Sequence, residues 1–465
     1  MLRTHTCGEL MTKHKDQQVT LCGWVHRRRD HGKLIFIDLR DRYGITQVVF
    51  VPSVPQAHSL AQSLGPEYVI QATGKVTVRP PKNVNPNIAT GEIELCAEDL
   101  VILNKSEVPI FEIDNTVEIA EEHRLTYRFL DLRREKVLRT LLLRDRVCEV
   151  IHRTLRKENF VFVETPVLTK STPEGARDFL VPSRLSPGEF FALPQSPQLF
   201  KQILMVAGLD KYYQIVKCFR DEDLRADRQP EFTQLDLEMS FAQEEDIFEI
   251  GERLFQEIFR EIKGVDIAVP FPRFKHADIM KKYKSDKPDL RPELGEWAFA
   301  WIVDFPLFQY NEEEKRWESE HHPFTSLREE DRSFLDSGQY DKIRSRSYDL
   351  ILNGHEIGSG SVRIHQRDLQ QKIFEIIGLD SQQAEKRFGF LLRAFQFGAP
   401  PHVGIGYGLD RLVAILAGLD SIRDTIAFPK TQKGHCLLSQ APSDVDKKQL
   451  RELGIMIIKK GGQHA

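Results

Sequence analysis

Arginine side chains in two distant segments could together bind the phosphates of a nucleotide. Arg220 ends an apolar, strand-like run and opens a highly charged hairpin, from which Phe232 returns on a second strand. Arg411 follows the glycine-rich run 404–408, which we expect to open an apolar helix. A guanidinium group can donate two parallel hydrogen bonds to one phosphate. Each segment alone is more typical of a solvated turn, but the two in this order predict a nucleotide site.

Two other kinds of nucleotide site do not fit this sequence. Position 409 is Leu, where the dinucleotide-binding fingerprint requires Gly. The chain also has no Gly-x-x-x-x-Gly-Lys-Ser/Thr loop. The sequence therefore argues against a dinucleotide-binding enzyme and against a P-loop enzyme.

Size and composition predict a soluble, cytoplasmic protein of two or three domains. The chain has 465 residues, of which 41% are hydrophobic and 29% are charged. Its apolar runs are too short for a membrane span, and its start lacks the apolar core of a signal peptide. The six cysteines form no Cys-x-x-Cys pair, so we expect reduced thiols and no zinc site.

Residues 1–105 predict an OB-fold, because three strand-like runs, a short helical stretch and two more strand-like runs follow one another. The strand-like runs are 19–25, 34–39, 45–50, 68–78 and 93–103, and the helical stretch is 55–64. Residues 1–50 carry nine Lys or Arg against five acidic residues. This local positive charge in a chain of net charge −4 suits a polyanion bound at one end.

Side chains that could bind single-stranded nucleic acid gather in this part of the chain. Arg27–Arg29 is expected in the turn between the first two strands, with Phe36 and Gln47 on the strands that follow. Cations can hold phosphates, an aromatic ring can stack on a base, and an amide can read a base edge. Strand alternation places Phe36 on the face opposite Ile35 and Ile37, which favours an exposed stacking role.

The rest of the chain predicts a linker and a second, larger domain. Residues 106–124 are polar and read as a linker, 125–445 as the second domain, and 446–465 as a C-terminal extension. Apolar residues recur at helical spacing over 138–155, and a strand then closes on Pro166.

These segments resemble class II aminoacyl-tRNA synthetases. Residues 219–236 and 404–411 resemble motifs 2 and 3 of that class, and the helix and strand that end at Pro166 resemble motif 1. Five further segments resemble bacterial-type aspartyl-tRNA synthetases, so that the likeness covers nearly the whole chain: 124–134, 171–179, 195–201, 321–325 and 353–363. The resemblance implies an anticodon-binding OB-fold, an α+β catalytic domain on an antiparallel sheet, and a homodimer formed through motif 1 around Pro166.

One departure from the family is clear. Bacterial-type members carry an inserted domain after the stretch that matches residues 285–291. Here residues 292–301 lead directly to the next strand, so the insertion is absent near 288–300.

The resemblance implies that L-aspartate reacts with ATP to give aspartyl-adenylate, and that the aspartyl group then passes to the 3′ end of tRNA-Asp. Arg220, Glu222 and Arg411 would be catalytic. The ATP-binding residues would be Arg220, Asp221, Glu222, Gln229, Phe232, Glu356, Gly408, Leu409, Asp410 and Arg411. The aspartate-binding residues would be Glu174, Ser196, Gln198, Lys201, Arg220, Asp236, His321, His322 and Arg363. The anticodon-binding residues would be Arg29, His31, Phe36 and Gln47. Asp349 and Glu356 are oxygen ligands at a spacing that can face one Mg²⁺ ion.

The expected amino-acid pocket explains a preference for aspartate. Arg363 can grip the side-chain carboxylate with two hydrogen bonds, and Lys201 can add a second charge. An asparagine amide would leave these cations unpaired. Glu174 and Asp236 could bind the ammonium group, and we expect the Pro/Gly-bounded loop that carries Glu174 to close over aspartate.

Alternative interpretations remain at this point. A relative specific for asparagine conflicts with the two cations, and a lysine pocket would need acids in their place. A non-catalytic paralogue that binds tRNA is a third alternative, although Arg220, Arg363 and Arg411 are all present. His31 resembles the family members that also charge tRNA-Asn, and we take this relaxed specificity as a hypothesis.

Overall fold

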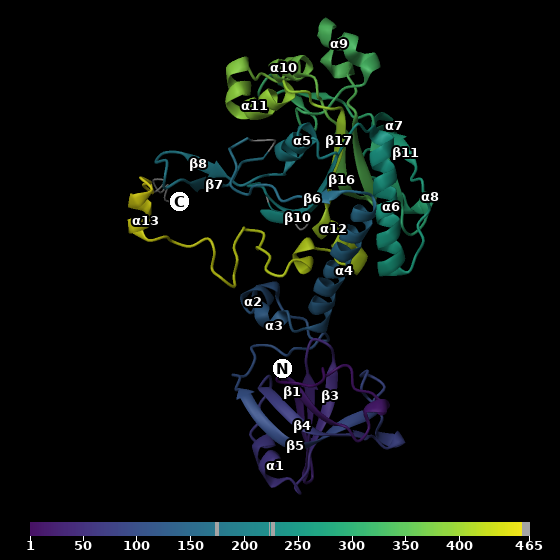
Figure 1. Cartoon of the computed structure of the whole chain (residues 1–465), viewed down its shortest axis with the longest axis vertical. Helices are drawn as coiled ribbons and strands as arrows, with labels where there is room; N and C mark the ends of the chain where they lie inside the picture. Colours follow the sequence, from purple (N-terminus) through teal and green to yellow (C-terminus); the bar gives the residue numbers. More distant parts are fainter. Residues whose placement is uncertain (173–175, 223, 225–227, 458–465) are drawn as a thin grey trace. The chain divides into compact units, whose positions relative to one another are not determined.

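The computed structural model describes residues 1–172, 176–222, 224 and 228–457. The chain divides into two compact units, Met1–Arg139 and Thr140–Ala465 (Figure 1). From the sequence, we predicted that the second domain starts at residue 125. The first compact unit ends at Arg139. Among the described residues, every helix is too short or too polar to cross a membrane.

The first unit contains a closed five-stranded barrel with strand order β1-β2-β3-β5-β4. Its elements are β1 (Gln18–His31), β2 (Leu34–Arg40), β3 (Ile45–Phe50), α1 (Pro55–Ala61), β4 (Val69–Val78) and β5 (Ile93–Asn104). Three strands, a helix and two strands is the predicted order, so the OB-fold is confirmed. After the barrel come α2 (Glu121–Thr126) and α3 (Arg128–Asp131).

The first strand is longer than predicted. We expected Arg27–Arg29 in a turn, but β1 continues to His31 and the chain reverses only at Gly32, where φ is +60°. A register shift between Val25 and Arg27 lets the strand keep pairing with β2, so that Arg29 lies opposite Phe36. The arginines are therefore held on a strand and not in a flexible turn.

The second unit is built on an eight-stranded sheet of order β11-β12-β15-β16-β17-β10-β9-β6. Its central strands are antiparallel, and only the edge pairs β11–β12 and β6–β9 are parallel, which agrees with the predicted α+β class. The strands are β6 (Val161–Phe162), β9 (Lys211–Phe219), β10 (Glu231–Ser240), β11 (Arg273–Lys275), β12 (Phe299–Val303), β15 (Ser347–Leu352), β16 (His355–Val362) and β17 (His402–Gly408).

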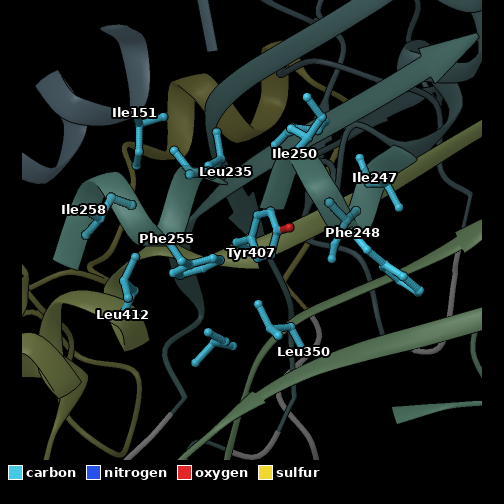
Figure 2. Close-up of a cluster of buried hydrophobic side chains, with 14 of the residues drawn as sticks. Ile151, Leu235, Ile247, Phe248, Ile250, Phe255, Ile258, Leu350, Tyr407 and Leu412 are labelled. Atoms are coloured by element: carbon cyan, nitrogen blue, oxygen red, sulfur yellow. The ribbon is translucent and has the colours of Figure 1, made fainter. Parts of the chain in front are cut away.

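Helices cover one face of this sheet and form the main core. The helices of the second unit used below are α4 (Glu135–Lys157), α5 (Gln198–Val206), α6 (Glu244–Lys263), α7 (His276–Tyr283), α8 (Arg291–Leu294), α10 (Arg367–Ile376), α11 (Ser381–Phe395) and α12 (Leu409–Ala417). Figure 2 shows Ile247, Phe248 and Ile250 of α6 beside Tyr407 of β17. Apolar residues three and four apart give α6 this buried stripe, and Gly264 at φ +69° ends the helix.

Strand alternation leaves the opposite face of the sheet for polar groups. Leu235, Leu237 and Met239 of β10 belong to the core, so Asp236 and Glu238 point to the other face. Both acidic side chains are nevertheless buried. A site on this face therefore has two carboxylates in its floor.

We expected the glycine-rich run 404–408 to open a helix. This prediction was wrong, because the run forms the strand β17. Helix α12 begins only at Leu409. Glycine is required at 404 by close packing, since a Cβ atom there would lie 1.8 Å from Oε2 of Glu238. At 406 a Cβ atom would lie 3.3 Å from Oδ1 of Asp236. The run thus leaves room for the two carboxylates.

The connection around residue 290 is short. Helix α7 ends at Tyr283 and α8 spans Arg291–Leu294. Gly295, at φ +92°, turns the chain towards β12, which begins at Phe299. The structure therefore has no separate domain between α8 and β12.

Candidate active site

A cavity of about 310 Å³ lies on the polar face of the sheet. It collects most of the residues that the sequence assigned to a site. The predicted residues that line it are Ser196, Gln198, Lys201, Arg220, Glu222, Gln229, Phe232, Asp236, His321, His322, Glu356, Arg363, Gly408, Asp410 and Arg411. They come from strands and loops far apart in the sequence, so the tertiary structure is what assembles them.

Three predicted residues do not line the cavity. Asp221 has a half-exposed side chain and donates its backbone N–H to the carbonyl oxygen of Arg177, 3.1 Å away. Leu409 is 1% exposed and packs in the core, so only its main chain can face a nucleotide. Asp349 is buried beside the cavity, on β15. Glu174 lies outside the described residues.

One end of the cavity holds two cations and two carboxylates. The Lys201 ammonium group lies 2.8 Å from Oδ1 of Asp236 and 3.4 Å from Oε2 of Glu238. Arg363 Nε donates to Oε1 of Glu238 at 2.9 Å, and Nη2 donates to Oε2 at 3.2 Å. Glu238 was not predicted, although its position two residues after Asp236 on a strand was a usable signal.

These pairs fix the charge states of the cluster. Burial alone would raise the pKa of Glu238, but Arg363 and Lys201 outweigh it and lower that pKa. Burial would lower the pKa of Arg363, and Glu238 reverses this and raises it. Glu238 and Arg363 therefore stabilise each other as a charged pair.

His322 holds Arg363 from its other side. Arg363 Nη1 donates to Nε2 of His322 at 2.7 Å and to Oγ of Ser361 at 2.7 Å. On the other side of the ring, Nδ1 of His322 lies 3.3 Å from the backbone nitrogen of Phe324 and 3.4 Å from Oγ1 of Thr325. Burial and the charge of Arg363 hold the pKa of His322 well below its ordinary value, so the ring is neutral.

These contacts leave Arg363 with less freedom than the sequence suggested. Glu238, His322 and Ser361 engage four of its five N–H groups. We expected Arg363 to grip a carboxylate with two of its own hydrogen bonds. Here it offers one N–H group, and a second donor must come from Lys201.

An acceptor for a positive group lies beside these cations. Oδ2 of Asp236 is buried and has no hydrogen-bond partner among the described residues. Ser196 accepts a hydrogen bond from the backbone N–H of Gln198, and the Gln198 amide donates to Gln202 at 3.1 Å. The amino-acid end can therefore bind an ammonium group next to a carboxylate.

The other end of the cavity combines an aromatic ring with arginines. Arg220 closes the base of the β9–β10 hairpin by donating its backbone N–H to Pro230, and its guanidinium group lies 5.2 Å from the Phe232 ring centroid. Arg411 reaches over from α12 and donates to the backbone carbonyl oxygen of Glu356. An aromatic plane flanked by guanidinium groups suits a base and its phosphates.

Two of the residues predicted to contact the nucleotide also have partners within the protein. The Gln229 amide donates to the carbonyl oxygen of Lys430 at 3.0 Å and accepts from the Lys430 N–H at 2.8 Å. Asp410 accepts from the backbone N–H of Thr233 at 2.7 Å and pairs with Arg144. Both side chains therefore hold elements together at the cavity edge.

Asp349, Glu356 and His321 form an acidic corner. Oδ1 of Asp349 is buried without a hydrogen-bond partner among the described residues, and Nε2 of His321 lies 3.5 Å from it. Burial and the charge of Asp349 raise the pKa of Glu356. Burial would lower the pKa of His321, but the hydrogen bond and the charge of Asp349 outweigh burial and raise this pKa. Two neighbouring carboxylates, one of which has an unpartnered oxygen, suit a divalent cation.

In the first unit, the four residues predicted to bind an anticodon lie close together on the barrel, although Gln47 is buried. Nη2 of Arg29 donates to Asp38 at 2.7 Å and to the Gln47 amide oxygen at 3.2 Å. The rings of His31 and Phe36 meet edge to face, with centroids 6.1 Å apart. Phe36 is half-buried, between the buried Ile35 and Ile37, as the alternation predicted.

Family models match both parts of the chain. Residues 120–432 match the family described as tRNA synthetases class II (D, K and N), and residues 19–103 match the OB-fold nucleic acid binding domain. The fold and the cavity define a class II synthetase joined to a nucleic-acid-binding barrel. The chain belongs to the class II tRNA synthetase family, and it is thus an ATP-using aminoacyl-tRNA ligase, as predicted.

Curated relatives narrow the comparison further. The chain is 43% identical to "Aspartate--tRNA(Asp/Asn) ligase" from Thermoanaerobacter sp. (strain X514), with 98% of each chain covered. It is also 43% identical to the ligase of the same name from Trichodesmium erythraeum, with 99% of this chain and all of the relative covered. The first alignment runs over 582 positions, so this relative carries segments that the 465-residue chain lacks.

Solved structures share the fold at lower identity. Asparaginyl-tRNA synthetase from Pyrococcus horikoshii, complexed with asparaginyl-adenylate, gives a TM-score of 0.76 at 24% identity and covers 93% of this chain and 99% of its own. Aspartyl-tRNA synthetase from Entamoeba histolytica gives 0.73 at 21% identity and covers 90% of each chain. At this identity the likeness concerns the fold alone.

Proposed function

We propose that this protein activates L-aspartate with ATP and transfers the aspartyl group to tRNA. The observation that carries the proposal is the single cavity that holds Lys201 and Arg363 at one end and Arg220, Phe232 and Arg411 at the other. The first end fits an acidic amino acid, and the second fits a nucleotide. The names of the relatives support the same substrate.

In the first step, an aspartate α-carboxylate oxygen forms a bond to the α-phosphorus of ATP, and pyrophosphate leaves with the electrons of the broken P–O bond. Arg220 would hold the α-phosphate and that carboxylate together, Phe232 would stack on the adenine, and Arg411 would bind the far phosphate. In the second step, the terminal ribose hydroxyl of the tRNA takes the aspartyl group, and AMP leaves. Such a reaction depends mainly on positioning and charge neutralisation.

Asp349 and Glu356 would hold Mg²⁺. The unpartnered Oδ1 of Asp349 and the raised pKa of Glu356 support this assignment. The ion would supply positive charge for the phosphates of the nucleotide.

Aspartate would be distinguished from asparagine by donors that come from two residues. One free N–H group of Arg363 and one of the Lys201 ammonium would each donate to a side-chain carboxylate oxygen. An asparagine amide can accept at its oxygen only, and its NH₂ group would face a cation. Oδ2 of Asp236 would accept from the ammonium group of the ligand.

Exchange of pyrophosphate into ATP tests this proposal without tRNA. We expect exchange with aspartate and none above background with asparagine or lysine. Arg220→Gln should reduce the exchange by about a hundredfold or more, since a charge-stabilising donor is lost. Exchange with another amino acid would reassign the substrate, and exchange with none would favour a non-catalytic paralogue.

The barrel would bind the anticodon through Arg29, His31, Phe36 and Gln47. The relatives are named for both tRNA-Asp and tRNA-Asn. His31 resembles the family members that charge both tRNAs, which supports the same specificity here. We therefore expect the protein to charge both purified tRNAs with aspartate. Failure to charge tRNA-Asn, with tRNA-Asp charged normally, would leave the ligase activity but reject the relaxed specificity.

A homodimer would form around Pro166. Val161, Phe162, Val167 and Leu168, on both sides of this proline, are between 36% and 52% exposed. Exposed apolar side chains so close together are typical of an interface. Sedimentation tests this proposal, and we expect a dimer for the wild type and a monomer for Phe162→Asp. A monomeric wild type would refute the proposed homodimer.

A further inference from the structure

Asp410 joins the two groups that would grip the nucleotide. It directly precedes Arg411, and its Oδ2 accepts the backbone N–H of Thr233 at 2.7 Å. Thr233 directly follows Phe232 on β10. Asp410 is 2% exposed, so a single buried carboxylate connects the start of α12 to the strand that carries the aromatic platform.

Arg144 supplies the charge that this buried carboxylate needs. It comes from α4, and its Nη1 donates to Oδ1 of Asp410. The same Nη1 lies 3.4 Å from the carbonyl oxygen of Thr425, and the Thr425 hydroxyl donates to the carbonyl oxygen of Asp410 at 3.4 Å. The side chain of Arg144 is 20% exposed and that of Asp410 is buried, so solvent screens the pair only in part.

We propose that Arg144 is a positioning residue for the nucleotide. This rests on the proposed function of the cavity. Arg144 does not line the cavity, so it would act through Asp410, which then fixes Phe232 and Arg411 at a constant separation. Without Arg144, the buried carboxylate would lose its charge partner, and it would turn towards water. Phe232 and Arg411 would then both bind the nucleotide less tightly.

The proposal predicts an effect on one substrate only. The amino-acid end is built from Lys201 on α5, from Asp236 and Glu238 on β10, and from Arg363 after β16. These residues are held by one another, and none of their hydrogen bonds given above involves Arg144 or Asp410. A loss of Arg144 should therefore weaken the binding of ATP and leave the binding of aspartate unchanged. A merely structural ion pair would lower the thermal midpoint without separating the two substrates.

Pyrophosphate exchange with Arg144→Met tests the proposal. We expect the KM for ATP to rise about tenfold or more, and the KM for aspartate to stay within about twofold. Arg144→Lys, which keeps the charge, should lie between the wild type and the methionine variant. Arg153→Met is a matched control, because Arg153 lies on the same helix and pairs with Glu149 and Glu261 at the surface. It should change neither constant.

A double-variant cycle adds a second measurement. In Arg144→Met with Asp410→Asn, the uncompensated charge is gone, so the combined loss of ATP affinity should be smaller than the sum of the single losses. Unchanged ATP affinity in folded Arg144→Met, or an equal loss for both substrates, would overturn the proposal. If the methionine variant does not fold, a wild-type ATP KM in Arg144→Lys would overturn it.

The test separates this proposal from the proposed function. If the wild type shows no aspartate-dependent exchange, the proposed function fails. Binding of ATP, measured by titration calorimetry on the wild type and the same variants, then still decides the role of Arg144. Weaker ATP binding in Arg144→Met supports the role, and equal binding overturns it.

Discussion

Arg363 shows how much of this site depends on the partners of single side chains. Its guanidinium group is held by Glu238 on one edge and by His322 and Ser361 on the other. A substrate therefore meets an arginine whose direction is already set. Such preorganisation lowers the cost of ordering side chains when the ligand binds.

Arg363→Lys should separate charge from geometry. Lysine keeps the positive charge, but it cannot serve Glu238, His322, Ser361 and the ligand at the same time. We expect the KM for aspartate to rise about tenfold to a hundredfold, since hydrogen bonds to charged groups contribute about 1.5–3 kcal/mol. The KM for ATP should change by less than about twofold. Pyrophosphate exchange with each substrate varied in turn measures both, and an unchanged KM for aspartate would contradict the proposed pocket.

His322 should make stability sensitive to acid. Burial and Arg363 keep its pKa in the folded protein well below 6.5, so the folded state stays neutral at that position while the unfolded chain takes up a proton. Its contribution is present above pH 6.5 and is lost as the pH falls below that value. The loss is about 1.4 kcal/mol at pH 5.5 relative to pH 7.5.

The matched variant for this effect is His322→Gln. Urea unfolding of both proteins at the two pH values isolates the histidine, because the other histidines are common to both. The wild type should lose more stability than the variant on acidification. An equal loss would show that His322 titrates normally in the folded state.

At the scale of elements, the glycines of β17 and the acids of β10 depend on each other. The two strands are antiparallel neighbours, and Glu238 pairs with Gly404 in register, as Asp236 does with Gly406. Side chains on β17 would fill the space that the carboxylates occupy. The run is therefore a strand with no side chains on the cavity face, although its sequence resembles a turn.

Gly404→Ala should disturb this arrangement. The new Cβ would fall 1.8 Å from Oε2 of Glu238 and 2.5 Å from the carbonyl oxygen of Leu237, so a backbone atom as well as a side chain must move. We expect a loss of at least about 2 kcal/mol of stability from overpacking. Gly408→Ala is the control for stability, since its nearest neighbour would be 3.7 Å away. Equal thermal midpoints for the two variants would contradict the packing argument.

At the scale of the whole molecule, the proposed sites of activation and of tRNA recognition fall in different compact units. The cavity is formed in Thr140–Ala465, and the proposed anticodon surface lies on the barrel in Met1–Arg139. Amino-acid activation and tRNA binding should therefore respond to different substitutions.

Phe36→Ala should affect tRNA alone. A stacked base contributes about 1–3 kcal/mol, so the KM for tRNA-Asp should rise on the order of tenfold. Pyrophosphate exchange needs no tRNA and should be unchanged. Tyr43→Ala removes another exposed aromatic ring of the barrel and should leave the KM for tRNA near the wild-type value. An unchanged KM in Phe36→Ala would remove this residue from the anticodon surface.

The sequence determined the elements and the chemistry of the site. The order of strand-like runs predicted the barrel, strand alternation predicted the outward direction of Phe36, and helical spacing predicted α4. These predictions were confirmed because they depend only on the spacing of residues that are close together in the sequence.

Only the tertiary structure decided which groups face each other. It placed Glu238 against Arg363, Gly404 against Glu238, and Arg144 of α4 against Asp410, across 125, 166 and 266 positions of the chain. It also gave Gln229 and Asp410, which line the cavity, hydrogen-bond partners within the protein. Burial and pairing depend on residues that approach only when the sheet forms, and the spacing of neighbours along the chain carries no record of them.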